Sequence, residues 1–198
     1  MASRPATRSR LGRDARRDAL LEAAVAIAAD GSVDEVTMEA VAERAGVSRP
    51  LLYKHFANRD ELVAAVYRQE AENLHRRLAR RVGEATTLEE MFDALITGAL
   101  EASADRGSLF SALRSAGGWT KDVRREQRTR DTATARAFTA VAKQEGLDPR
   151  RAGPAMSMLL SLVDATIVQF RARPGAERAA LLHDTYMTIV RSTIAALR

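Results

Sequence analysis

Residues 37–56, TMEAVAERAGVSRPLLYKHF, constrain the fold more than any other part of the chain. Thr37 is a favourable N-cap, and the apolar positions after it recur with helical spacing as far as Gly46, a residue type that ends helices at positive φ. Ser48 then caps a second helix, with Pro50 in its first turn. Two short helices joined by a tight turn are therefore predicted.

The second predicted helix has a core side and a solvent side. Leu52 and Phe56, four residues apart, are expected to pack into the core. The solvent side carries basic and aromatic side chains, namely Arg49, Tyr53, Lys54 and His55. Such a surface on the second helix of a helix–turn–helix suits the major groove of DNA. The alternative is an ordinary packing element, because the same geometry also occurs without DNA binding.

This run, followed by RDEL at residues 59–62, resembles the DNA-binding domain of the TetR (tetracycline repressor) family over roughly residues 14–66. The resemblance implies base contacts from Arg49, Pro50 and Tyr53. It implies phosphate contacts from Thr37, Ser48, Lys54, His55 and Arg59. Two positions depart from the family pattern: Leu51 stands where a small or hydroxyl residue is common, and Arg59 where lysine is usual.

The positive charge of the chain is concentrated at its N-terminus. Residues 1–17 carry six arginines and one aspartate, so they account for the whole net charge of +5. We expect residues 1–13 to form a disordered basic arm that either contacts phosphates or only adds solubility. Arg16 and Arg17, at the start of the first helix, are expected to contact phosphates.

Helical periodicity continues to the end of the chain, and no strand or repeat is predicted. The prediction is an all-α fold of about nine helices. A three-helix helix–turn–helix head occupies residues 14–58, and a helical effector-binding and dimerisation domain occupies residues 59–198. The helices expected after the head cover about residues 59–82, 87–103, 108–116, 120–145, 148–170 and 176–197.

The helix near residues 149–170 is apolar nearly all round, which raises the question of a membrane span. Ser157, Asp164 and Gln169 interrupt it, so we predict no membrane association. We instead expect a homodimer through residues 149–197, in which the last two helices pair with their copies around Val163 and Ile189. Two heads at a fixed separation would then read a palindromic operator.

The sequence gives little support for catalysis. Cysteine is absent, which excludes thiol chemistry and Cys-ligated zinc and fits the cytoplasm. His55, His75 and His183 lie far apart, and Gly117-Gly118 lacks the other residues of a phosphate loop. We therefore predict no catalytic, metal or cofactor site. The N-terminus lacks the apolar run of a signal peptide.

The resemblance also implies an effector cavity in the C-terminal domain. The candidate lining residues are mostly apolar and aromatic, which indicates a small hydrophobic effector: Met91, Phe92, Leu95, Phe110, Leu113, Arg114, Trp119, Phe138 and Met156. The alternative for each is plain core packing.

These observations predict a dimeric, sequence-specific transcriptional regulator, a repressor that a small hydrophobic effector releases from double-stranded DNA. The alternative is a helical ligand-binding or protein-interaction module with non-specific DNA affinity. The operator, the effector and the regulated genes are not encoded in these patterns.

Overall fold

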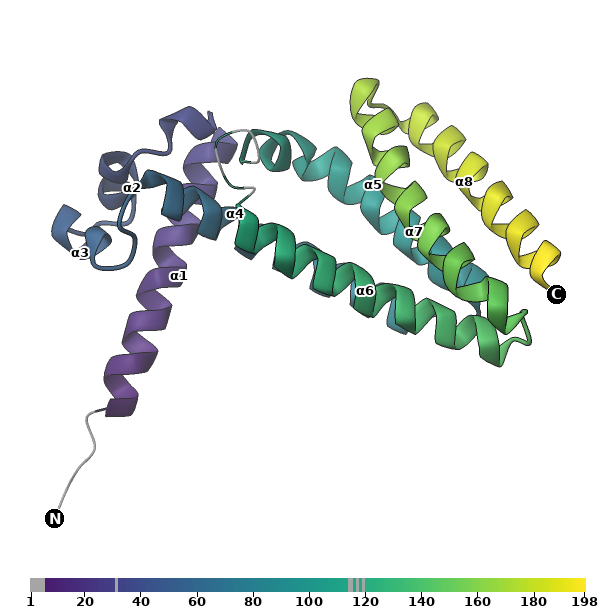
Figure 1. Cartoon of the computed structure of the whole chain (residues 1–198). Coiled ribbons are helices and arrows are strands. Elements are labelled where there is room, and N and C mark those ends of the chain that lie inside the picture. Colours follow the sequence, from purple (N-terminus) through teal and green to yellow (C-terminus); the bar gives the residue numbers. More distant parts are fainter. Residues whose placement is uncertain (1–5, 31, 114–115, 117, 119) are drawn as a thin grey trace, which may run out of the picture. The chain divides into compact units, whose positions relative to one another are not determined.

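The computed structural model describes residues 6–30, 32–113, 116, 118 and 120–198, and in these residues it contains helices and no strand (Figure 1). The all-α prediction is confirmed. The α-helices are α1 (Ala6–Asp30), α2 (Met38–Arg44), α3 (Arg49–Tyr53), α4 (Arg59–Gly83), α5 (Leu88–Leu113), α6 (Lys121–Gln144), α7 (Pro149–Ala172) and α8 (Ala176–Leu197). A short 3₁₀ helix, η1 (Val33–Glu35), lies between α1 and α2.

The described residues form eight α-helices where about nine were expected. The difference lies in α5, which continues through residues 103–107, where a break between two helices was predicted. A glycine inside a helix costs only about 1 kcal/mol relative to alanine. Leu109 and Leu113, beyond Gly107, are both buried, so continuing the helix places them in a core.

The N-terminal arm also differs from the expectation. Helix α1 begins at Ala6 and not near Asp14, so residues 6–13, expected to be disordered, are helical in the structure. Alanine, arginine and leucine make up most of this segment, and all three favour helix. Residues 1–5 lie outside the described part of the chain.

The chain divides into two compact units, which we call the head and the body. The head comprises residues 1–71 and 108–123, and the body comprises residues 72–107 and 124–198. The head thus extends beyond the expected boundary at residue 58, because Leu62, Val63 and Val66 of α4 are buried in the same cluster as Leu20 and Leu52. Helices α4 and α5 each supply residues to both units.

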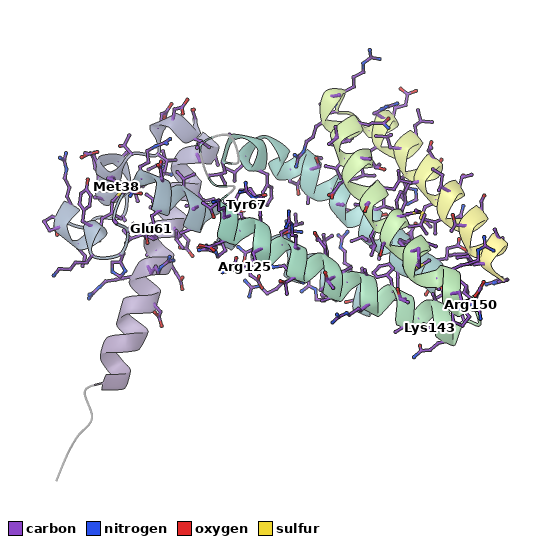
Figure 2. All side chains as sticks on the ribbon, viewed as in Figure 1. Met38, Glu61, Tyr67, Arg125, Lys143 and Arg150 are labelled. Carbon is purple, nitrogen blue, oxygen red and sulfur yellow. The ribbon has the colours of Figure 1, made fainter. Side chains whose placement is uncertain are left out.

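Part of the head core comes from far along the chain. Phe110 of α5 contacts Tyr67 of α4 edge-on, with ring centroids 5.9 Å apart. Gly118 lies so close to Leu113 and Tyr67 that a Cβ atom there would be 2.6 Å from the Leu113 carbonyl oxygen and 2.9 Å from Tyr67 Cβ. A larger residue at position 118 would therefore push these segments apart. Figure 2 shows Met38 and Tyr67, two buried side chains of the head.

The body is built around an aromatic cluster. Phe92 of α5 lies against Phe138 of α6, with 4.7 Å between ring centroids, and its ring is 6.3 Å from that of Tyr186 of α8. The Tyr186 hydroxyl donates to the Leu159 carbonyl oxygen of α7 at 3.1 Å. These contacts join α5, α6, α7 and α8. Lys143 and Arg150 in Figure 2 belong to the exposed surface of the same unit.

Two local signals determine where α5 and α7 begin. The Glu90 carboxylate accepts hydrogen bonds from the Thr86 hydroxyl and the Thr86 and Thr87 N–H groups, which lowers the pKa of Glu90. Thr87 Oγ1 in turn accepts from the Glu90 N–H at 3.2 Å, so Thr87 and Glu90 form a capping box at the start of α5. Asp148 caps α7 by accepting from the Arg150 N–H at 2.9 Å.

Helices α7 and α8 lie side by side (Figure 1). By length and composition α7 is apolar enough to cross a membrane, and 28% of its most apolar stretch is buried in the structure. Ser157, Asp164 and Gln169, which interrupt that stretch, are exposed. Several large apolar side chains of the two helices are exposed as well: Met158, Val168, Leu181 and Ile189. Val163, expected to face a dimer partner, belongs instead to the core of the body.

The buried Tyr186 should make the body less stable at alkaline pH. Burial raises the pKa of its phenol well above the usual value of about 10. The unfolded tyrosine therefore loses its proton near pH 10 while the folded one keeps it, so the free energy of unfolding falls as the pH rises above 10. We expect Tyr186→Phe to remove up to about 1.4 kcal/mol per pH unit of that slope.

Urea titrations between pH 8 and 11.5 measure this effect. Below pH 10 the variant should lose only the hydrogen bond to Leu159, about 0.5–1.5 kcal/mol. Tyr53→Phe is the control, because Tyr53 is 49% exposed. Equal slopes for Tyr186→Phe and the wild type would contradict the expectation.

Candidate nucleic-acid interface

The turn between α2 and α3 has the predicted geometry. Thr37 Oγ1 accepts from the Ala40 N–H at 3.1 Å, which caps α2. Gly46 adopts a φ of 65°, in the left-handed region that favours glycine, and the Val47 N–H then returns to the Ala42 carbonyl oxygen at 2.9 Å. The chain is thereby redirected into α3 within four residues.

The orientation of α3 is set by two buried side chains. Leu52 and Phe56 are 0% and 1% exposed, so the opposite side of α3 faces solvent. This exposed side carries Ser48, Arg49, Pro50, Tyr53 and Lys54. His55 is half-buried, with its ring centroid 6.5 Å from that of Phe56. The structure thus brings together the residues for which base contacts were predicted.

The two hydroxyl residues predicted to bind phosphate have different local roles. Thr37 uses its oxygen as a capping acceptor, which leaves its hydroxyl proton available to donate. Ser48 occupies the N-cap position of α3, but its side chain makes no capping hydrogen bond. Both hydroxyls can therefore donate to a phosphate oxygen without giving up their present bonds.

Arg49 is an exposed basic candidate, and it has a partner. Its Nη1 lies 3.3 Å from Oε1 of Glu39, in the first turn of α2. Its side chain is 64% exposed and that of Glu39 is 51% exposed. Exposed ion pairs are worth only about 0–1 kcal/mol, so this one leaves Arg49 free to bind DNA.

Arg59 has a role that the sequence did not indicate. Its Nε donates to the Val36 carbonyl oxygen at 2.9 Å and its Nη2 donates to the Val33 carbonyl oxygen at 2.8 Å. Nη2 is also 3.8 Å from the Asp34 carboxylate. The guanidinium therefore ties the start of α4 to η1, the segment that leads into α2. The predicted phosphate contact would have to come from its remaining N–H groups.

The basic residues of α1 are also divided in role. Arg16 is exposed, whereas the guanidinium of Arg17 lies 4.7 Å from the centre of the Phe56 ring. This cation–π contact covers the buried side chain that anchors the end of the α3 segment. Arg17 therefore stabilises the buried position of Phe56, in addition to any phosphate contact.

The candidate effector residues are distributed over the two units. Met91, Phe92, Leu95, Phe138 and Met156 belong to the core of the body or lie against it. Leu113 belongs to the core of the head, and Phe110 is partly buried against it. Arg114 and Trp119 lie outside the described residues. The predicted lining is thus split between two units, because α5 continues into the head.

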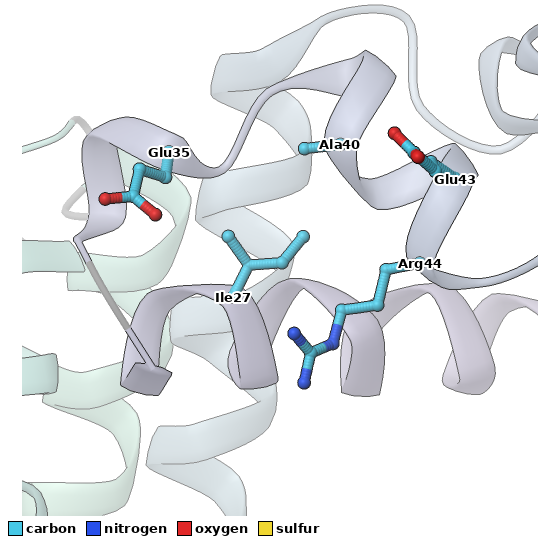
Figure 3. A pocket seen from close by; sticks show the side chains of 5 residues that line it. All are labelled: Ile27, Glu35, Ala40, Glu43 and Arg44. Atoms are coloured by element: carbon cyan, nitrogen blue, oxygen red, sulfur yellow. The ribbon is translucent and has the colours of Figure 1, made fainter.

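The described residues contain no cluster of three or more His, Asp and Glu side chains that could hold a metal ion. His183 of α8 bonds Asp93 of α5 through Nε2 at 2.9 Å, and its Nδ1 is 3.4 Å from Asp184. This arrangement joins two helices of the body. The head has a pocket of about 430 Å³, lined by Ile27, Glu35, Ala40, Glu43 and Arg44 (Figure 3).

Comparisons with known proteins agree with this interface. Residues 20–66 match the family model of bacterial regulatory proteins of the tetR family. A 66-residue segment is 44% identical to the HTH-type transcriptional activator FasR of Mycolicibacterium smegmatis, and it covers 33% of this chain and 30% of FasR. The identity thus applies to one part of each protein.

Solved structures show the same fold along nearly the whole chain. A tetR-family regulator from Streptomyces coelicolor superposes with a TM-score of 0.71 at 20% identity, covering 93% of this chain and 84% of that one. FadR of Bacillus subtilis, solved in complex with stearoyl-CoA, gives a TM-score of 0.62 at 17% identity, covering 87% and 96%.

The bonds of Arg59 predict a stability effect that is local to the head. We expect Arg59→Met to lower the free energy of opening α2 by about 1–3 kcal/mol, because two carbonyl groups lose charged donors. Hydrogen exchange of the α2 amides measures it. Arg76→Met is the control. Arg76 also lies on α4 and donates to Asn73 at the surface, so this substitution should lower the free energy by no more than about 0.5 kcal/mol. Equal effects would exclude the tie between α4 and η1.

Proposed function

We infer that this chain, which belongs to the TetR family of bacterial regulatory proteins, is a dimer that binds a palindromic operator through α3 and leaves it when a small apolar effector binds the body. The family consists of DNA-binding transcriptional regulators and not of enzymes. The observation that carries the proposal is the burial of Leu52 and Phe56, which turns Arg49, Tyr53 and Lys54 outward together. An exposed α3 with these side chains suits the major groove.

A dimer is proposed because α7 and α8 expose apolar side chains that a soluble monomer would normally cover. Met158 is 73% exposed and Val168 is 66% exposed, and both lie on α7. A copy of the chain related by a two-fold axis would cover them by packing four helices together. Two heads held in this way would contact half-sites about 34 Å apart on one face of the DNA.

The proposed effector is small and apolar, because the packed core of the body includes aromatic and methionine side chains that an apolar ligand could contact. FadR, a structural neighbour, binds stearoyl-CoA in its solved structure. Since Phe92 and Phe138 are in contact, a ligand at this position would separate them. Helix α4 supplies residues to both units and would transmit the change. By linkage, effector and DNA would weaken each other by the same factor, about 5- to 150-fold.

The proposed mode is repression, because a protein that occupies a promoter needs no surface other than the one that contacts DNA. The proposed location is the cytoplasm. FasR, which matches the head, is named an activator. A reporter behind a promoter that carries the operator distinguishes the two modes. Removing the regulator raises expression if it represses and lowers expression if it activates.

Arg49→Ala tests base recognition. We expect a loss of about 1–3 kcal/mol on the operator and relaxed preference at one base pair per half-site. Lys54→Ala should instead weaken all sequences alike and reduce the salt dependence by about one phosphate contact. The operator is first selected from random duplexes with the wild-type protein, and affinities are measured by fluorescence anisotropy.

Two outcomes would count against this function. If Arg49→Ala selects the same DNA motif as the wild type, Arg49 does not read a base. If the wild-type chain prefers its selected sequence to random DNA by much less than about a thousandfold, the chain is a module with non-specific DNA affinity.

Val168→Asp with Ile189→Asp tests the dimer. Both positions are exposed in the monomer, so the charges should leave its fold intact but oppose the pairing of α7 and α8. Burying an unpaired charge costs several kcal/mol, and the dimer dissociation constant should rise at least about a hundredfold. Sedimentation velocity at micromolar concentration measures this. Ala133→Asp, at an exposed position of α6, is the control. A folded wild-type monomer would exclude the proposal.

A further inference from the structure

The DNA-contacting surface of the head carries a carboxylate next to its main base-reading candidate. Glu39 Oε1 lies 3.3 Å from Nη1 of Arg49, and both side chains are more than half exposed. Glu39 belongs to the first turn of α2, and Arg49 is the first residue of α3. The pair therefore bridges the two helices of the helix–turn–helix on the side that α3 presents to solvent.

A negative charge at this place requires an explanation, because the proposed ligand is a polyanion. Glu39 does stabilise the N-terminus of α2 through the helix dipole, but an acid in the first turn does so without a pairing arginine. The pair itself adds little stability, since it is exposed. It does bias the direction of Arg49, because a contact worth up to about 1 kcal/mol favours one rotamer of a long side chain several-fold over the others.

We propose that Glu39 determines specificity, by holding Arg49 in position for the edge of a guanine and by disfavouring its contact with phosphate. The proposal rests on the proposed function of the head as a DNA reader. Arginine has five N–H donors, of which guanine O6 and N7 take two, so one can remain on Glu39. The carboxylate and the guanine edge can thus share one guanidinium.

Non-specific complexes would be affected in the opposite way. There, basic side chains bind phosphate oxygens, which carry negative charge. If Arg49 turned toward a phosphate, it would either leave Glu39 unpaired or bring the carboxylate near the phosphate, and both are unfavourable. Glu39 therefore lowers affinity for random DNA more than affinity for the operator, which raises the ratio between them.

Glu39→Gln is the test, with Glu43→Gln as its matched control. Both changes remove one negative charge from α2, and Glu43 lies one turn further along the helix, in the pocket with Arg44 (Figure 3). Each variant is titrated against the operator selected by the wild type and against a random duplex, at several salt concentrations. Thermal unfolding confirms that each variant is folded.

We expect Glu39→Gln to bind random DNA about 3- to 10-fold more tightly and to steepen the salt dependence of that binding by about one phosphate contact, because Arg49 is released. Operator affinity should change by no more than about twofold in either direction, so the specificity ratio falls. Glu43→Gln should change both affinities by the same factor and leave the ratio intact. In an Arg49→Ala background, Glu39→Gln should leave the ratio unchanged.

Three results would overturn the inference. If Glu39→Gln and Glu43→Gln had the same ratio of operator affinity to random-DNA affinity, Glu39 would act only through its general negative charge. Persistence of the Glu39→Gln effect without Arg49 would lead to the same conclusion. If Glu39→Gln bound random DNA with the same salt dependence as the wild type, Glu39 would not be keeping Arg49 away from phosphate. Failure of the wild type to select any motif would instead reject the function of the head itself.

Discussion

The seating of Leu52 and Phe56 in the head core is the constraint on which the DNA-facing surface depends. These two side chains belong to a segment too short to be a stable helix in isolation, since α3 has five residues. Tertiary contacts must therefore hold it, and Arg17 adds a cation–π contact on the Phe56 ring. Each exposed side chain of α3 has its direction because the opposite side is anchored.

A second set of contacts fixes the position of α2, the helix that precedes α3. Arg59 reaches back 26 residues to the Val33 carbonyl, and the Thr37 hydroxyl closes the first turn of α2. Polar groups that could bind phosphate thus also maintain the framework. This sharing has a consequence for mutagenesis: a variant that loses DNA affinity at position 37 or 59 has lost structure as well as contact.

Local signals in the sequence were sufficient for the helix–turn–helix of residues 37–56. Caps, a glycine with positive φ and the spacing of Leu52 and Phe56 act within a few residues, so they can be recognised without knowing the fold. The bonds of Arg59 join residues 23 and 26 positions apart, and no local pattern encodes them. The continuity of α5 was missed because a glycine weakens a helix without ending it.

The body shows another limit. An amphipathic helix reveals its buried side through the position of its polar residues, and α7 has few of them: Ser157, Ser161 and Asp164 recur at helical spacing and are exposed. Val168, four residues after Asp164, lies on this exposed side, whereas Val163 is in the core, so the prediction that Val163 faces a partner overlooked this weak phase. The candidate effector residues were chosen by family resemblance and residue type, and the course of α5 divides them between two units.

The head is discontinuous along the chain, and this affects the order in which the protein can fold during synthesis. Domains commonly fold as units while the ribosome is still extending the chain. Here residues 1–71 lack part of their own core until residues 108–123 have been made. During that interval Tyr67 and its neighbours have no Phe110 or Leu113 to cover them. The nascent DNA-binding unit therefore reaches its final form only after the first segment of the body, residues 72–107, has been translated.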